Sequence, residues 1–218
     1  MTDDAQRLAQ AHRFAGWTLA ELAADLGLAL PASPTRSKGA IGQLVERALG
    51  AEAGPRATPD FASGLELKTL PVDARGKPAE STFVTMVSTL DLERPWERSQ
   101  VRAKLARVLF VPVESRSVRP FPERRFGRAF LWSPSPTEEE VLARDWAELS
   151  ELVLVHGEID ARRGEALQIR PKARDAADTT RRADAEGAPA RVLKRGFYLR
   201  ARFTEGILSG SGLVRPRR

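Results

Sequence analysis

The chain of 218 residues has no cysteine, only two histidines and a single tyrosine. Without cysteine it can form no disulfide, thiolate metal site or cysteine nucleophile, which suits a reducing cytosol. His12 and His156 have no partners at metal-ligand spacing, so a histidine metal site and a serine triad are poorly supported. A glycine-rich phosphate loop of the Walker or dinucleotide type is absent as well.

Long hydrophobic runs are also missing. No apolar segment approaches the ~20 residues that cross a bilayer, and the acidic start Met1-Thr2-Asp3-Asp4 does not resemble a signal peptide. Apolar residues nevertheless make up 42% of the chain, an ordinary share for a globular protein. We therefore expect a cytoplasmic protein with a well-formed core and no membrane association.

The positive charge is unevenly distributed. The formal net charge is +6, and arginines gather around Glu123 at Arg116, Arg119, Arg124, Arg125 and Arg128. Residues 215–218 form a basic tail that we expect to be mobile. A concentrated basic surface fits a polyanion such as DNA, RNA or an acidic membrane. Composition alone leaves open the alternative that these arginines only cover a solvated surface.

Helical and strand patterns follow one another along the chain. Apolar spacing and capping residues predict helices over 3–13, 18–27, 37–49, 101–108 and 137–155, with capping boxes at Thr18 and Thr137. Apolar runs predict strands over 65–70, 82–88, 109–113, 130–132, 167–170 and 196–200, and residues 175–188 form a helix or a loop. This order predicts a mixed α/β (α+β) fold, with a mixed sheet flanked by helices. We expect one domain, 1–218, with two lobes around a cleft.

The segment from Asp60 to Lys68 (DFASGLELK) carries the strongest chemical signal. On a strand, Glu66 and Lys68 point to one side while the leucines between and before them face the core. Two carboxylates can hold a hard divalent cation that activates water, and a nearby lysine can orient that water or neutralise charge. The alternative is a solvated edge strand with a surface ion pair of little consequence. The apolar neighbours favour the site, because buried charges are costly without a ligand.

Further charged residues gain meaning only if the fold brings them to this strand. Glu46 lies off the apolar stripe of its predicted helix and would add a third carboxylate if that helix packs beside the strand. Lys104 lies on a predicted helix, where it either faces solvent or contacts a phosphate. Both assignments depend on packing that the sequence does not show.

A second set of residues belongs to later strands. Arg170 and Lys172 flank Pro171 at a strand end, where two cations can contact guanine edges or clamp phosphates. Tyr198, the only tyrosine, lies between Arg195 and Arg200. For Tyr198, and for Phe83, ordinary packing is the alternative to a ligand contact.

Several segments together resemble one family, the DNA mismatch-repair endonuclease MutH. They occur in the family's order and cover nearly the whole chain: KGAIG from Lys38, Glu46 with LGA from Leu49, PDFA from Pro59, GLELKTLPVD from Gly64, TFV from Thr82, VRAKL from Val101, LWSP from Leu131, LQIRPKA from Leu167 and RGFYL from Arg195. One such match is weak, whereas the ordered set is specific. In one respect the chain departs from the family pattern, because the spacer from Asp60 to Glu66 is one residue shorter. We expect the bend at Ala62-Ser63-Gly64 to absorb it.

The resemblance implies a type II restriction-endonuclease-like fold around a DNA cleft. It also implies Mg²⁺-dependent nicking, with Mn²⁺ as a substitute, of the unmethylated strand at hemimethylated d(GATC) sites. The implied partners are MutL and, indirectly, MutS, and the enzyme is expected to be a monomer. A stand-alone type II restriction endonuclease for GATC is one alternative, and a DNA-binding module without catalysis is another.

The resemblance also assigns residues. The implied catalytic set is Asp60, Glu66, Lys68, Glu46 and Lys104, with Asp60 and Glu66 as metal ligands. The implied DNA contacts are Lys38, Phe83, Arg170, Lys172 and Tyr198, with Tyr198 near the adenine whose methylation is sensed.

Overall fold

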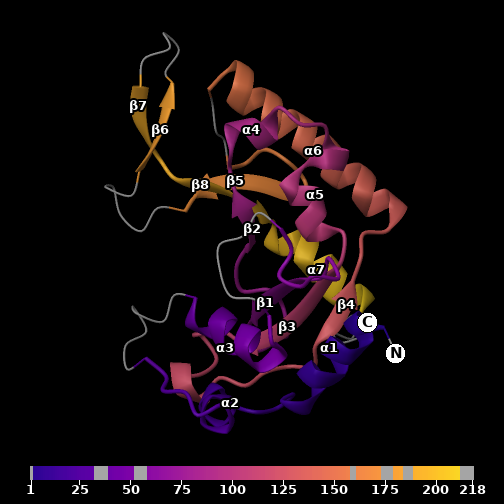
Figure 1. The fold of residues 1–218 in the computed structure, drawn as a ribbon, viewed down its shortest axis with the longest axis vertical. Coiled ribbons are helices and arrows are strands. Elements are labelled where there is room, and N and C mark those ends of the chain that lie inside the picture. The colour runs from indigo at the N-terminus through magenta and orange to yellow at the C-terminus, as the bar shows by residue number, and fades with distance from the viewer. Residues whose placement is uncertain are drawn as a thin grey trace. The chain divides into compact units, whose positions relative to one another are not determined.

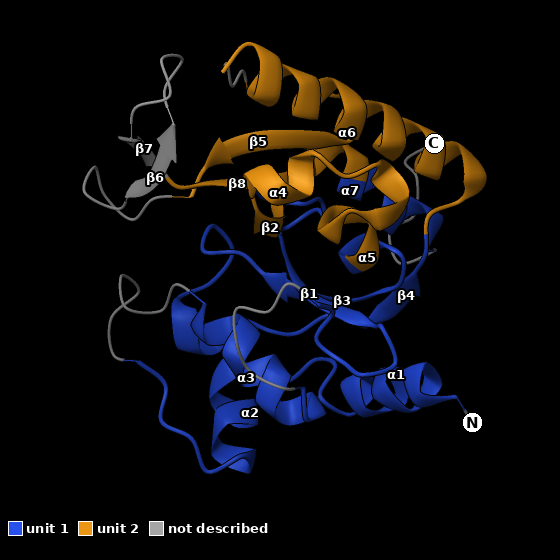
Figure 2. Ribbon diagram, turned by 45° about the horizontal axis from the view of Figure 1, so that its top comes forward, with its two compact units in different colours: residues 1–80, 104–133, 204–218 blue, residues 81–103, 134–203 orange. Residues whose placement is uncertain are grey.

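The computed structural model describes residues 2–31, 39–51, 58–157, 161–172, 179–183 and 189–211, with the backbone alone for 179–183 and 189–193. The chain divides into two compact units (Figure 2). Unit 1 comprises residues 1–80, 104–133 and 204–218, and unit 2 comprises 81–103 and 134–203. No helix in the described part of the chain is long and apolar enough to cross a membrane.

Unit 1 is a three-stranded sheet with helices packed against it (Figure 1). Its strands are β1 (Glu66–Val72), β3 (Val108–Glu114) and β4 (Phe130–Trp132). β1 runs parallel to β3, and β4 runs antiparallel to it, so β1 is an edge strand. Its helices are α1 (Asp3–Arg13), α2 (Leu19–Asp25) and α3 (Ala40–Leu49), with a short 3-10 helix at Phe121–Glu123.

Strand alternation gives the unit 1 sheet two different faces. Leu65, Leu67, Leu109 and Val111 join one hydrophobic core with apolar residues of α1, α2 and α3. The residues between them point the other way. On that second face Phe110 stacks on Phe130 with 5.4 Å between ring centroids. Glu66 and Lys68 belong to the second face by the same alternation.

Unit 2 is built on the antiparallel sheet of β2 (Thr82–Met86), β8 (Arg195–Leu199) and β5 (Leu167–Pro171), with β8 in the centre. Its helices include α4 (Thr89–Leu92), a 3-10 helix at Trp96–Arg98 and the long α6 (Pro136–Val155). α5 (Gln100–Leu105) and α7 (Ala201–Gly210) each cross the boundary between the units. β6 (Thr179–Ala183) and β7 (Pro189–Leu193) pair antiparallel as a separate ribbon.

The unit 2 sheet also has an apolar and a polar face. Phe197, Ile169 and Leu199 are almost fully buried, and the Phe197 ring lies 5.1 Å from that of Trp146 on α6. The intervening positions, Tyr198 on β8 and Arg170 on β5, point to the opposite face. α6 therefore covers one side of the sheet and leaves the other to polar and aromatic side chains.

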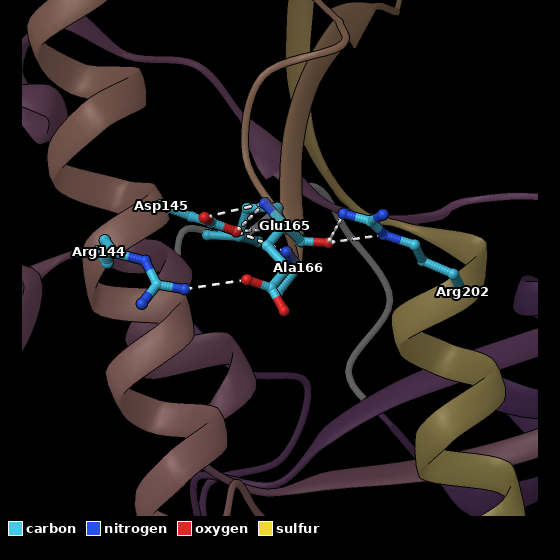
Figure 3. A network of polar contacts seen from close by, with 6 residues as sticks. Arg144, Asp145, Glu165, Ala166 and Arg202 are labelled. Carbon is cyan, nitrogen blue, oxygen red and sulfur yellow. Dashed lines mark hydrogen bonds and ion pairs between the residues drawn. The ribbon is translucent and has the colours of Figure 1, made fainter.

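A buried carboxylate fixes the start of β5 to α6 (Figure 3). Asp145 accepts the backbone N–H groups of Glu165, Ala166 and Leu167 at distances of 2.6 to 2.9 Å. Arg144 pairs with the Glu165 side chain at 3.0 Å, and Arg202 donates to the Glu165 carbonyl. These contacts set where β5 begins and hence where its later residues lie.

The predicted mixed α/β fold is confirmed, but some local predictions are wrong. The long helix begins after Ser135, not Thr137, because Ser135 and Glu138 form the capping box and Pro136 occupies the first turn. Residues 179–183 are a strand rather than a helix or loop. The predicted helix over 37–49 begins at Ala40 after Gly39 in the structure.

Candidate functional site

Glu66, the first residue of β1, is buried, and its carboxylate pairs with the ammonium groups of two lysines. It is only 1% exposed, and Lys104 is 5% exposed. The Lys104 Nζ donates to both carboxylate oxygens, at 2.9 and 3.1 Å, and the Lys68 Nζ donates to Oε1. Such burial rules out the alternative of a solvated surface pair. Burying a carboxylate and two ammonium groups costs desolvation energy, and such charged clusters are typical of functional sites.

Asp60 is held at the start of the same strand by a tight turn. Its Oδ2 accepts the Leu67 N–H at 2.9 Å, and the Phe61 N–H donates to the Leu65 carbonyl at 3.1 Å. Gly64 closes the turn with φ of +83°, a left-handed conformation that other residues adopt only with strain. The predicted bend between Asp60 and Glu66 is therefore present.

The turn is tied to its surroundings by Arg107, the residue just before β3. The Arg107 guanidinium donates to the Ser63 carbonyl and pairs with Asp4 of α1 at 2.9 Å. The Arg107 carbonyl accepts the Glu66 N–H at 2.9 Å. Arg107 thus contacts the middle of the segment that separates the two carboxylates, at Ser63, and its end, at Glu66.

Glu46 of α3 adds a third acid whose ionisation is opposed. Burial raises the pKa of the Glu46 carboxyl first, the negative charge of Asp60 raises it further, and that of Glu66 adds to the same direction. Lys68 alone acts in the opposite sense. Glu46 is therefore close enough to Asp60 and Glu66 to be affected by their negative charges. We call Glu46, Asp60, Glu66, Lys68 and Lys104 the carboxylate–lysine centre.

The donor chemistry of this centre fits a hard divalent cation, since carboxylate oxygens are the ligands that Mg²⁺ takes. Within the described residues no three acidic or histidine side chains already stand in a metal-holding arrangement. Both oxygens of Glu66 instead accept hydrogen bonds from lysines. A cation that used Glu66 would therefore take the place of an ammonium.

Four of the DNA-contact residues named from the sequence come together on the polar face of unit 2. The rings of Phe83 and Tyr198 meet edge to face with 5.4 Å between centroids. The Lys172 Nζ lies 3.4 Å from the Phe83 centroid, and the Arg170 guanidinium lies 5.8 Å from that of Tyr198. We call these four residues the aromatic–cation cluster. Cations over aromatic faces remain charged, so the cluster offers a surface suited to an anionic ligand.

Ser81 and Gln168 support this cluster, although sequence reasoning missed both. The Gln168 Nε2 donates to the Ser81 hydroxyl at 2.6 Å, and the Arg170 Nη1 reaches the same hydroxyl at 3.5 Å. Neither residue type signals such a role in the sequence. Gly196, also missed, lies inside β8 directly opposite Arg170. A glycine within a strand is a recognisable signal of close approach.

The named residues thus fall into two groups. All members of the carboxylate–lysine centre belong to unit 1, and all members of the aromatic–cation cluster belong to unit 2. Lys38, named as a DNA contact, lies outside the described residues. The roles themselves remain predictions.

Comparison with known proteins gives a consistent result. The family described as DNA mismatch repair enzyme MutH matches residues 49–145. A "DNA mismatch repair protein MutH" of Vibrio campbellii is 46% identical over 209 residues, covering 94% of this chain and 92% of the relative. The protein of the same name from Yersinia enterocolitica is 46% identical over 213 residues, covering 95% and 93%. That from Salmonella paratyphi B is 47% identical over 211 residues, covering 94% and 91%.

Proposed function

The chain belongs to the MutH family, and on that premise we propose that it is a DNA mismatch-repair endonuclease. Its substrate is the unmethylated strand of duplex DNA at hemimethylated d(GATC) sites, which it nicks by phosphodiester hydrolysis. It acts in the cytoplasm, as a monomer, and is activated by MutL after mismatch recognition by MutS. The observation that carries the proposal is the buried Glu66 between Lys68 and Lys104 in a chain so similar to these repair proteins.

Within this proposal each residue of the centre has a distinct task. Asp60 and Glu66 would hold the Mg²⁺, or Mn²⁺ in its place, and the ion would supply polarisation of the phosphate and a lowered pKa of its bound water. Lys68 is partly exposed on the edge strand, so it is the lysine placed to orient the nucleophile or meet the phosphate. Lys104 is buried and stabilises the charge of Glu66. Glu46 adds a third carboxylate beside Asp60 and Glu66.

The aromatic–cation cluster supplies recognition in this proposal. Arg170 and Lys172 contact base edges or phosphates through their positively charged groups. Phe83 and Tyr198 offer aromatic surface to the bases, and Tyr198 is near the adenine whose methylation is sensed. Lys38 adds a further DNA contact.

One experiment separates this function from its competitors. The protein with Mg²⁺ is incubated with unmethylated, hemimethylated and fully methylated GATC duplexes, with and without MutL, and products are resolved on denaturing and native gels. We expect nicks confined to unmethylated strands and a higher rate with MutL. Replacing Mg²⁺ by EDTA should abolish the products.

Other outcomes would overturn the proposal in defined ways. Efficient double-strand breaks without MutL would identify a stand-alone restriction endonuclease. Specific binding without cleavage under any divalent metal condition would identify a DNA-binding module that has lost catalysis.

A further inference from the structure

The centre of the unit 2 sheet carries a glycine whose backbone does not require one. Gly196 pairs with Met86 on β2 and with Arg170 on β5. Positive φ values are recorded at other glycines but not at Gly196, so a residue with a side chain could adopt its backbone conformation. A glycine inside a strand weakens the strand, because glycine loses more conformational entropy on folding than other residues and packs no side chain. The reason for this glycine therefore lies in the space around it.

That space is filled by Phe83. A Cβ on residue 196 would lie 2.6 Å from Cε2 and 3.2 Å from Cδ2 of the Phe83 ring, and 3.1 Å from the Thr85 carbonyl oxygen. The pairing of β2 with β8 shifts register between Phe83 and Thr85, so β2 is irregular opposite Tyr198 and Phe197, the residues that follow Gly196. The ring thus rests on bare backbone, and any side chain at position 196 would push it away.

The Phe83 ring in turn holds the rest of the cluster. Its face carries the Lys172 ammonium at 3.4 Å from the centroid, and its edge packs with Tyr198. Lys172 follows the end of β5. Its backbone N–H donates to the Lys194 carbonyl at 2.8 Å, which fixes the backbone there. The hydrogen bond therefore positions the backbone of Lys172, and the Phe83 ring positions its ammonium group.

We propose that Gly196 is a positioning residue for DNA recognition: its missing side chain seats Phe83, and Phe83 presents the Lys172 ammonium to the duplex. This inference rests on the proposed function and deepens it, because Gly196 itself need not touch DNA. The half-buried Phe83 and Tyr198 lie on the face opposite Phe197 and Leu199, so the seat serves the ligand-facing side of the sheet and not its core.

The test is a double-mutant cycle with Gly196→Ala, Phe83→Ala and the double variant, measured as binding to a GATC duplex and to a scrambled duplex at several salt concentrations. Gly196→Ala should weaken GATC binding about tenfold, the usual effect of losing one good cation contact to DNA. In the Phe83→Ala background the same change should have no further effect, because no ring remains to displace. Gly206→Ala is the matched control, since a Cβ there meets nothing within 4 Å.

A readout without DNA keeps the seat separate from the proposed function. Ring proton NMR signals of Phe83 and Tyr198 should shift in Gly196→Ala and stay unchanged in Gly206→Ala. Unmoved signals, wild-type GATC affinity in Gly196→Ala, or an additional loss in the double variant beyond Phe83→Ala would each overturn the positioning role. If Gly196→Ala shifts the ring signals but the wild-type protein binds no DNA, the proposed function is overturned and, with it, the DNA role of Gly196.

Discussion

The two groups of functional residues handle positive charge in opposite ways. In the carboxylate–lysine centre, the ammonium groups of Lys68 and Lys104 both pair with the carboxylate of Glu66, and the three side chains are largely buried. In the aromatic–cation cluster, Lys172 and Arg170 lie over the rings of Phe83 and Tyr198, whose quadrupole attracts a cation. The first arrangement pairs the lysines with a buried carboxylate, whereas the second places cations on aromatic faces. Chemistry and recognition should therefore be separable by mutation.

Glu66→Gln should separate catalysis from DNA binding most clearly. The change keeps the shape of the side chain but removes a metal-binding charge, so we expect nicking to fall on the order of 10³-fold. DNA binding should stay within about threefold, because no phosphate contact is lost. Single-turnover cleavage and fluorescence anisotropy measure the two effects, and Glu205→Gln, at an exposed pair with Lys77, is the control. Equal losses of cleavage and binding would mean that the two groups are not separable.

Lys104→Met tests whether Lys104 and Glu66 form a buried ion pair in the protein without a ligand. Removing one partner of a buried ion pair typically costs about 3–5 kcal/mol. Lys104→Met should fall near the lower end, because Lys68 still donates to Glu66. Urea unfolding in EDTA measures the loss. The matched change Lys77→Met removes an exposed cation and should cost about 0–1 kcal/mol. Equal costs for the two variants would contradict the buried pairing.

Lys172→Ala tests the opposite property in unit 2. An exposed cation held over a ring contributes little to folding but one contact to a polyanion, so affinity should fall about tenfold and the salt slope by about one. The free energy of unfolding should change by less than about 1 kcal/mol. Lys77→Ala, at an exposed pair with Glu205, is the control for a general loss of charge. An unchanged salt slope would show that Lys172 does not meet a phosphate.

The smallest expected effect concerns pH and Glu46. Its folded pKa is raised above the ordinary 4.5, so folding favours the protonated form. The protein therefore keeps this contribution below pH 4.5 and loses it as pH rises through the folded pKa. Glu46→Gln should remove that loss, so its stability relative to wild type should increase with pH above 4.5 in metal-free buffer. Urea unfolding from about pH 4 to about pH 7, a range that begins below the ordinary pKa of 4.5 and extends above it, tests this, and a constant difference would contradict it.

Local sequence rules anticipated much of the carboxylate–lysine centre. The alternation of Leu65, Glu66 and Leu67 placed the acid on the face away from the leucine core, and Gly64 marked the bend. What the alternation could not give was the burial of Glu66, because that depends on Lys104, which approaches from 38 residues away. Partners distant in sequence are set by tertiary packing, which no local pattern records.

The aromatic–cation cluster was harder to foresee. Phe83, Arg170 and Tyr198 were named individually, but their contact follows from β8 pairing with both β2 and β5. Register across three strands decides that Phe83 and Gln168 both lie opposite Tyr198. The predicted cap at Thr137 is also wrong, because Ser135, two residues earlier, accepts the Glu138 N–H and caps the helix.

The contacts of Asp145 provide a natural probe of unit 2. The amide hydrogens of Glu165, Ala166 and Leu167 all point at one buried carboxylate, although they lie at the start of a strand, where exchange with solvent is usually fast. In heavy water these three amides should exchange as slowly as those in the middle of a sheet. Their protection would report whether the platform that carries Arg170 and Lys172 is intact, independently of any nucleic acid or catalytic assay.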